Sequence, residues 1–330
     1  MGRGQLDLEL IDLIAPIADS AAQLDRACRE LGFFLVPLSV VPADVADRAW
    51  DAAHRFFALP EATKRQVGFP EPGYPYGWSP FGFESLSASL DDASAGDGGV
   101  SDAGADRTRD LKESYSVGPD CLGPAPSPVD AGEAWIRSAS LWPAEPADLR
   151  PAFTAYFRAQ SDVAARLLSI MAVALDLPVD HFAGLIDRHT SALRALHYRA
   201  IGADTPVGSL RAGAHSDYGT LTILRTDNVK GLEIRRPDGT WLEIVPRTDA
   251  FVVNLGDSIA QWTNDRWRST VHRVTLADPA PRYSLAFFHM ANWDATIECL
   301  PSCRSATEPA RYPPVKAGPW LMRKFQSTVT

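Results

Sequence analysis

Three residues in the second half of the chain have the types and spacing of a metal site. His215 and Asp217 lie two positions apart, and His272 follows later in the chain. In an extended strand, residues i and i+2 point to the same side, so His215 and Asp217 can bind one ion together. Two histidines and one carboxylate form a facial ligand set for Fe(II) that leaves other coordination positions open. We therefore predict a redox-active iron centre here.

A candidate anion site follows ten residues after the last of these ligands. Arg282 and Ser284 share one face of a strand, where they can offer a guanidinium and a hydroxyl to the carboxylate of a co-substrate. A single His-x-Asp pattern often arises by chance, and Arg282 alone could form a surface ion pair. The five residues together, in this order, favour a metal centre with a neighbouring carboxylate site.

Strand-like segments surround these residues. They are short apolar or alternating runs bounded by turn residues, at 220–225, 231–235, 241–245, 251–255, 273–276 and 283–288. Asp238-Gly239 is a hairpin signal. Many short strands at this spacing predict a mainly β fold with two opposed sheets, with the metal held in the mouth between them. Asn254 and Asp257 are expected to shape a turn beneath the metal.

The rest of the chain shows helical patterns. Apolar residues recur at three and four positions over 147–176, and Pro178 ends that run. Shorter helices are predicted at 21–30 and 42–57, with strands at 32–36 and 6–12. We expect the long helix to pack against the main sheet, which gives a mainly β fold with flanking helices.

Composition excludes several function classes. The chain has 330 residues, a net charge of −9 and 45% hydrophobic residues. The negative charge argues against nucleic acid or an acidic membrane surface as a partner. No run of 18 apolar residues and no signal-peptide pattern occurs, so we predict a cytoplasmic protein, a monomer or weak homodimer. Four cysteines are too few for a disulfide scaffold, and Cys299 and Cys303 lack the second pair that a zinc site needs.

With these motifs the chain resembles the isopenicillin-N-synthase-like family of 2-oxoglutarate- and Fe(II)-dependent oxygenases. The matching stretches are 11–13, 31–34, 56–60, 111–115, 141–143, 215–222, 253–257, 261–264, 268–274, 282–284 and 312–314. The resemblance runs almost end to end, with one interruption near 87–110. It implies a single oxygenase fold over 1–330, with an N-terminal part at 1–145 and a double-stranded β-helix (jelly-roll, cupin-like) core at 190–325.

The resemblance also implies roles for individual residues. The iron ligands would be His215, Asp217 and His272. Arg282, Ser284 and Tyr198 would hold the distal carboxylate of 2-oxoglutarate, whose keto acid end chelates the iron. The family usually has Asn two residues before this tyrosine and Pro directly after it, where this chain has Leu196 and Arg199. The Asn contact is therefore absent.

Substrate and reaction are less defined by the sequence. The resemblance places these residues on the substrate side: Trp78, Phe81, Phe83, Glu84, Lys112, Glu113 and His289. It implies a reaction with O2 that releases succinate and CO2 and hydroxylates, desaturates or cyclises a small metabolite, in specialised-metabolite biosynthesis. Two alternatives stay open, an iron oxidase that does not use 2-oxoglutarate and a non-catalytic binding protein on the same fold.

The interruption at 87–110 is an acidic insertion. It holds six Asp and is otherwise mostly Ser, Ala and Gly, so it contains little that can be buried. We expect a flexible segment near the rim of the mouth that serves either as a lid or as a solvated spacer.

Overall fold

The computed structural model describes residues 5–86, 109–124, 127–202, 205–206 and 208–329. The predicted acidic insertion lies almost entirely outside these residues, and of it only Arg109 and Asp110 are described.

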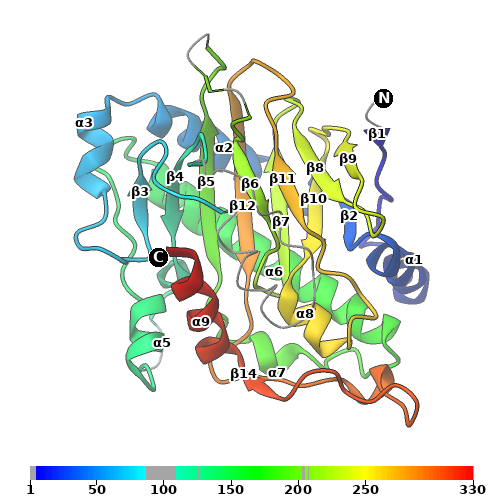
Figure 1. Ribbon diagram of the computed structural model, residues 1–330. Helices are drawn as coiled ribbons and strands as arrows, with labels where there is room; N and C mark the ends of the chain where they lie inside the picture. Colours follow the sequence, from blue (N-terminus) through cyan, green and yellow to red (C-terminus); the bar gives the residue numbers. More distant parts are fainter. Residues whose placement is uncertain (1–4, 87–108, 125–126, 203–204, 207, 330) are drawn as a thin grey trace.

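Two β-sheets form the centre of the fold (Figure 1). The major sheet has the order β2-β10-β7-β12-β5-β4-β3, with strands Phe33–Pro37, Ala250–Leu255, Leu221–Thr226, Arg282–His289, Ala192–Tyr198, Glu113–Val117 and Gly77–Ser79. The minor sheet has the order β1-β9-β8-β11-β6, with strands Gln5–Leu6, Trp241–Ile244, Leu232–Arg235, His272–Val274 and Ala212–His215. All neighbouring strands are antiparallel except β1 and β9. This confirms the predicted sheet-rich architecture.

The two sheets pack face to face through a small apolar core. Leu35, Leu196 and Ala286 of the major sheet join Ile234 and Val274 of the minor sheet in one buried cluster. Successive side chains of a strand point to opposite faces, so the same strands carry a second set of side chains on their other face. In the major sheet, residues of one parity line the space between the sheets, and those of the other parity face the helices.

A helical layer covers the outer face of the major sheet. It consists of α1 (Ile17–Glu30), α2 (Ala43–Phe57) and α6 (Leu149–Ala174), and Figure 1 shows α6 passing behind the strands. Phe153, Tyr156 and Phe157 of α6 recur at helical spacing and are fully buried against the sheet. The predicted helices thus form close to their expected positions, and the long one packs where it was expected.

Shorter elements complete the chain. They are α3 (Glu61–Lys64), α5 (Ala131–Ile136), α7 (Ala183–Ile186), α8 (Asp257–Trp262), α9 (Ala317–Val329), β13 (Thr296–Ile297) and β14 (Val315–Lys316). Helix α9 packs against α5, where the rings of Trp135 and Phe325 are 5.7 Å apart. Among the described residues, no helix combines the length and apolarity that crossing a membrane requires.

Two sequence predictions about strands need correction. The alternating run at 6–12 forms only the short strand β1 and an isolated bridge at Leu10. The strand that carries His215 ends there, so Asp217 lies in the connection to β7. The backbone carbonyl of Asp217 accepts a hydrogen bond from the amide of Asp257 at 2.8 Å, and this contact with the start of α8 replaces strand pairing.

The backbone beneath Asp217 is packed too closely for side chains. A Cβ added at Gly256 would overlap the carbonyl oxygen of Gly219 and lie 3.0 Å from that of Asp217. Glycine is needed here because of this close approach of backbone to backbone.

We predict that Gly256→Ala lowers the free energy of unfolding by about 1–3 kcal/mol, because the added methyl group meets rigid backbone. Urea unfolding would measure the loss. Gly184→Ala is the matched control, since a Cβ at Gly184 meets nothing within 4 Å. Equal stability of the two variants would contradict the close approach described above.

Candidate metal centre and co-substrate site

The strand register brings the three predicted ligands together. His215 ends β6, His272 begins β11, and the two residues are direct partners across the antiparallel pair. The Nε2 atoms of His215 and His272 lie 3.8 and 3.9 Å from Oδ1 of Asp217. The three candidate ligand atoms all lie within 4.8 Å of one another, which is compatible with one shared ion.

Backbone carbonyls fix the tautomer of both histidines. Nδ1 of His215 lies 2.8 Å from the carbonyl oxygen of Gly213, and Nδ1 of His272 lies 3.1 Å from that of Thr270. Donation from Nδ1 leaves the lone pair on Nε2, the atom that faces Asp217. Burial, and next the neighbouring His272, lowers the pKa of His215, which favours the neutral imidazole that a metal requires.

Two side chains orient the carboxylate of Asp217 through the oxygen that does not face the histidines. Oδ2 of Asp217 accepts hydrogen bonds from Thr222 at 2.5 Å and from the side-chain amide of Asn254 at 2.7 Å. Oδ1 therefore stays available for the metal. Burial by itself would raise the pKa of Asp217, but the two histidines and these two donors outweigh it and lower the pKa.

This contact of Asn254 was missed by the sequence prediction, which gave it only a turn-shaping role. The available signal was a lone amide within the apolar run of β10. Asp257 does shape the turn, as predicted.

The donor set fits Fe(II). Each of the three residues offers one unoccupied lone pair, each has its second polar atom engaged elsewhere, and no fourth protein ligand crowds the group among the described residues. Three protein ligands on one face leave positions for a chelating co-substrate and O2.

Arg282, Ser284 and Tyr198 also come together, farther along the space between the sheets. Arg282 pairs with Tyr198 across β12 and β5, and its guanidinium carbon lies 5.2 Å from the centre of the tyrosine ring. The Arg282 side chain is 1% exposed and donates to Thr226 at 2.8 Å and to Ser284 at 3.5 Å. Thr226 was not predicted.

The two sites lie along the same strand. Thr222 supports the metal ligand and Thr226 contacts Arg282, and both belong to β7. Four residues of a strand span about 13 Å, and the two threonines share one face. A molecule that binds the metal at one end and Arg282 at the other would lie along this strand.

A network of four charged residues lies beside the metal strand. Lys112 contacts Asp110 at 2.5 Å and Glu84 at 3.3 Å, and Arg194 contacts Glu84 at 3.2 Å. Asp110 also accepts a hydrogen bond from the amide of Gly213 in β6 at 2.8 Å. Burial would raise the pKa of Glu84, but the two cations outweigh it and lower the pKa to about 2. We call Glu84, Asp110, Lys112 and Arg194 the β6 charge network.

Two other predicted substrate-side residues face the helical layer. Glu113 is buried against Lys64, Trp78 and His197, with hydrogen bonds of 2.8 Å to each. Parity explains this placement, since Glu113 shares the helix-facing side of β4 with the core residue Tyr115. Glu113 and Trp78 therefore lie on the wrong face of the sheet for a substrate role.

His289 also lies on the helix-facing side of the major sheet. It is fully buried, 2.6 Å from the hydroxyl of Thr220, and its ring contacts those of His189 and Phe287. His189, which was expected to be solvated, is buried too. The structure gives His289 a packing role on the helix side of β12.

The remaining two predicted residues lie at the surface of the segment after β3. Phe83 is 56% exposed and packs on Phe69, whereas the ring of Phe81 lies 3.6 Å from the guanidinium carbon of Arg199. Of the predicted substrate-side set, only Glu84 and Lys112 belong to the β6 charge network.

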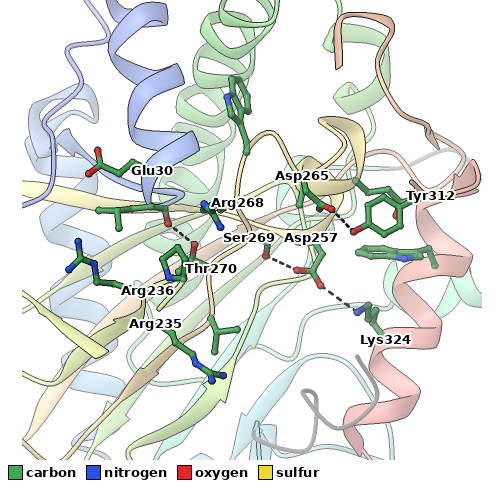
Figure 2. Close-up of a pocket in the computed structure, with 17 residues that line it drawn as sticks. Glu30, Arg235, Arg236, Asp257, Asp265, Arg268, Ser269, Thr270, Tyr312 and Lys324 are labelled. Carbon is green, nitrogen blue, oxygen red and sulfur yellow. Dashed lines mark hydrogen bonds and ion pairs between the residues drawn. The ribbon is translucent and has the colours of Figure 1, made fainter. Parts of the chain in front are cut away.

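A separate cavity of about 590 Å³ opens between α8, α9 and the segment that precedes His272. Figure 2 shows Asp257 of this cavity between Ser269, at 2.6 Å, and Lys324 of α9, at 3.5 Å. None of the three candidate metal ligands lines it. The cavity therefore lies behind the ligand-bearing segment.

Comparison with known proteins agrees with this geometry. Residues 190–291 match the family described as the 2OG-Fe(II) oxygenase superfamily, and residues 6–145 match the one described as the non-haem dioxygenase in morphine synthesis N-terminal. The chain is 31% identical over 298 residues to a 2-oxoglutarate-Fe(II) type oxidoreductase, hxnY, of Emericella nidulans, covering 89% of this chain and 80% of the relative. This chain belongs to the 2-oxoglutarate- and Fe(II)-dependent oxygenases.

Further matches span nearly the whole chain. Kihadalactone A synthase of Citrus sinensis is 31% identical, with 97% of this chain and 92% of the relative covered. A Neurospora crassa enzyme solved in complex with alpha-KG superposes with a TM-score of 0.82 at 26% identity, covering 99% of this chain and all of that one. The same enzyme has also been solved with alpha-KG and thymine.

These findings establish the class of the protein. It is an oxidoreductase with the double-stranded β-helix fold that uses Fe(II) and 2-oxoglutarate. The two alternatives raised from the sequence, an oxidase independent of 2-oxoglutarate and a non-catalytic binding protein, are set aside.

We predict that Asn254→Ala weakens metal binding about 10–100-fold, the usual effect of removing a group that orients a metal ligand. Metal titration of the apoprotein would measure it. Asp257→Asn is the control, because Asp257 contacts Ser269 and Lys324 and not the ligand side chains. Unchanged affinity in Asn254→Ala would show that Thr222 alone orients Asp217.

Proposed function

We propose that this enzyme oxidises an unactivated carbon of a small metabolite, with His215, Asp217 and His272 as iron ligands and Arg282, Ser284 and Tyr198 as the 2-oxoglutarate carboxylate site. The observation that carries the proposal is the convergence of the three ligand atoms within 4.8 Å, with their second polar atoms already engaged.

The protein residues bind and orient the reactants. When bound, iron would activate O2, which is the oxidant, and 2-oxoglutarate would supply two electrons as it is decarboxylated to succinate and CO2. Arg282 and the hydroxyls of Ser284 and Thr226 hold the far end of the co-substrate in a buried site. Asn254 and Thr222 keep Asp217 turned toward the metal. Burial between the sheets excludes bulk water from this region.

The charges of the β6 charge network indicate that the substrate is small and polar. Two carboxylates and two cations balance in charge, and Glu84 keeps a partly exposed edge. The names of similar proteins also point to small molecules, since one is a kihadalactone A synthase and another was solved in complex with thymine. We propose hydroxylation, desaturation or cyclisation in specialised-metabolite biosynthesis, with the substrate resting against Glu84 and Lys112.

The test of the proposed metal site is succinate release in the presence of Fe(II), ascorbate and 2-oxoglutarate. We expect His215→Ala, Asp217→Ala and His272→Ala each to abolish turnover while the circular dichroism spectrum stays that of the wild type. Each variant removes one of three ligands from a site built by strand pairing. Activity close to wild type in any one variant would remove that residue from the ligand set.

A second prediction concerns the co-substrate. Arg282→Leu should raise the KM for 2-oxoglutarate, since truncating one partner of a buried charge pair costs roughly 2–5 kcal/mol. Ser284→Ala and Tyr198→Phe remove single hydrogen bonds, so we expect smaller losses of about 0.5–3 kcal/mol. Initial rates across 2-oxoglutarate concentrations provide the measurement. An unchanged KM in Arg282→Leu would place the carboxylate elsewhere.

A further inference from the structure

Arg211 is a buried cation whose hydrogen-bond donors are only partly used. It directly precedes β6 and its side chain is 0% exposed, and within the described residues its Nε and Nη1 atoms have no hydrogen-bond partner. Its Nη2 atom donates to the backbone carbonyls of Arg199 and Ala280. A guanidinium carries five donors, and leaving them unpaired in a buried site is costly. The contacts of Arg211 within the protein therefore do not compensate its buried charge.

The two carbonyls locate Arg211 at the carboxylate site. Arg199 directly follows Tyr198, and Ala280 lies two residues before Arg282. The backbone amide of Arg211 donates to Val274 at 2.8 Å, which anchors the residue on the minor sheet. Arg211 thus reaches from the minor sheet to the place where Arg282 and Tyr198 extend from the major sheet.

The two arginines are close enough to affect each other. Burial lowers the pKa of Arg211, and the charge of Arg282 is the next cause, partly offset by Tyr198, Asp278 and Asp227. Neither carboxylate makes an ion pair with the arginines in the described part of the chain. Asp278 instead accepts the amide of Ala280, and Asp227 accepts the amides of Val229 and Tyr283.

Arg282 has a smaller deficit of the same kind. Its Nε atom is buried without a partner among the described residues. Two neighbouring guanidiniums with free donors, enclosed in a low-dielectric site, require an anion with several acceptor positions. A carboxylate has four such positions and accepts bidentate donation.

We propose that Arg211 is a second guanidinium of the 2-oxoglutarate site and grips the distal carboxylate together with Arg282. The proposal rests on the role proposed above for Arg282. It gives the enzyme a binding-site residue that the Arg-x-Ser pattern does not reveal. Arg211 would also make the site specific for 2-oxo acids that carry a distal carboxylate, because an acid without one would leave two buried cations unpaired.

The experiment compares two ligands in the full-length protein loaded with Mn²⁺, which binds without turnover. Calorimetry gives the Kd of 2-oxoglutarate and of 2-oxopentanoate, which lacks the distal carboxylate. We expect Arg211→Gln to weaken 2-oxoglutarate binding by at least about tenfold, the equivalent of 1.4 kcal/mol. Binding of 2-oxopentanoate should stay the same. Arg211→Lys keeps the charge without the planar fork and should lie between wild type and Arg211→Gln.

Arg225→Gln is the matched control. Like Arg211, Arg225 donates to a backbone carbonyl, that of Ala46, but it is only partly buried and pairs with Asp47 of α2 on the helix side. We expect Arg225→Gln to leave the Kd of 2-oxoglutarate and that of 2-oxopentanoate unchanged. If Arg211→Gln proves unstable by thermal unfolding, the ratio of the two Kd values in Arg211→Lys decides instead.

Two results would overturn the proposal. Equal weakening of both ligands, or no change in either, would make Arg211 a support for the Arg199 and Ala280 segments only. Failure of the underlying assignment gives a different pattern, since Arg282→Leu would then leave the Kd of 2-oxoglutarate unchanged whatever Arg211→Gln does.

Discussion

The antiparallel pairing of β6 with β11 is the constraint on which the candidate metal centre depends. It places His215 opposite His272 and brings both imidazoles to the carboxylate of Asp217. A shift of one residue in this register would turn one imidazole to the other face of the sheet and separate the ligands. Asp217 lies beyond the strand, where the tight contact between Gly256 and Gly219 sets the path of the backbone.

A second consequence of the sheet geometry is that polar groups line a buried space. Thr222, Thr226 and Ser284 present hydroxyls between the sheets, alongside the guanidinium of Arg282. Buried polar groups are tolerated when each finds a partner, and most of these do. Within the described residues, Nε and Nη1 of Arg211 and Nε of Arg282 are exceptions, and we propose that the distal carboxylate of 2-oxoglutarate binds there.

The helical layer explains why some chemically suggestive residues are not part of the site. Lys64, Glu113 and His197 form a satisfied cluster on the outer face of the major sheet, under α2 and α3. His289 is buried on the same face against Phe287, whose ring in turn contacts Phe157 of α6. These groups stabilise the packing of helices on the sheet, whereas the β6 charge network occupies the opposite face beside the metal strand.

The sequence by itself determined the candidate ligand types, their order, the Arg282 and Ser284 pair, and the positions of the three helices that cover the major sheet, because these depend on local spacing and periodicity. Only the tertiary structure decided that Asn254 orients Asp217, that Thr226 and Arg211 lie at Arg282, and that Trp78, Glu113 and His289 face the helices. Such contacts join residues far apart in the chain. They follow from strand register and from which face of each strand is turned inward, and neither is set by local sequence when both faces of a sheet are buried.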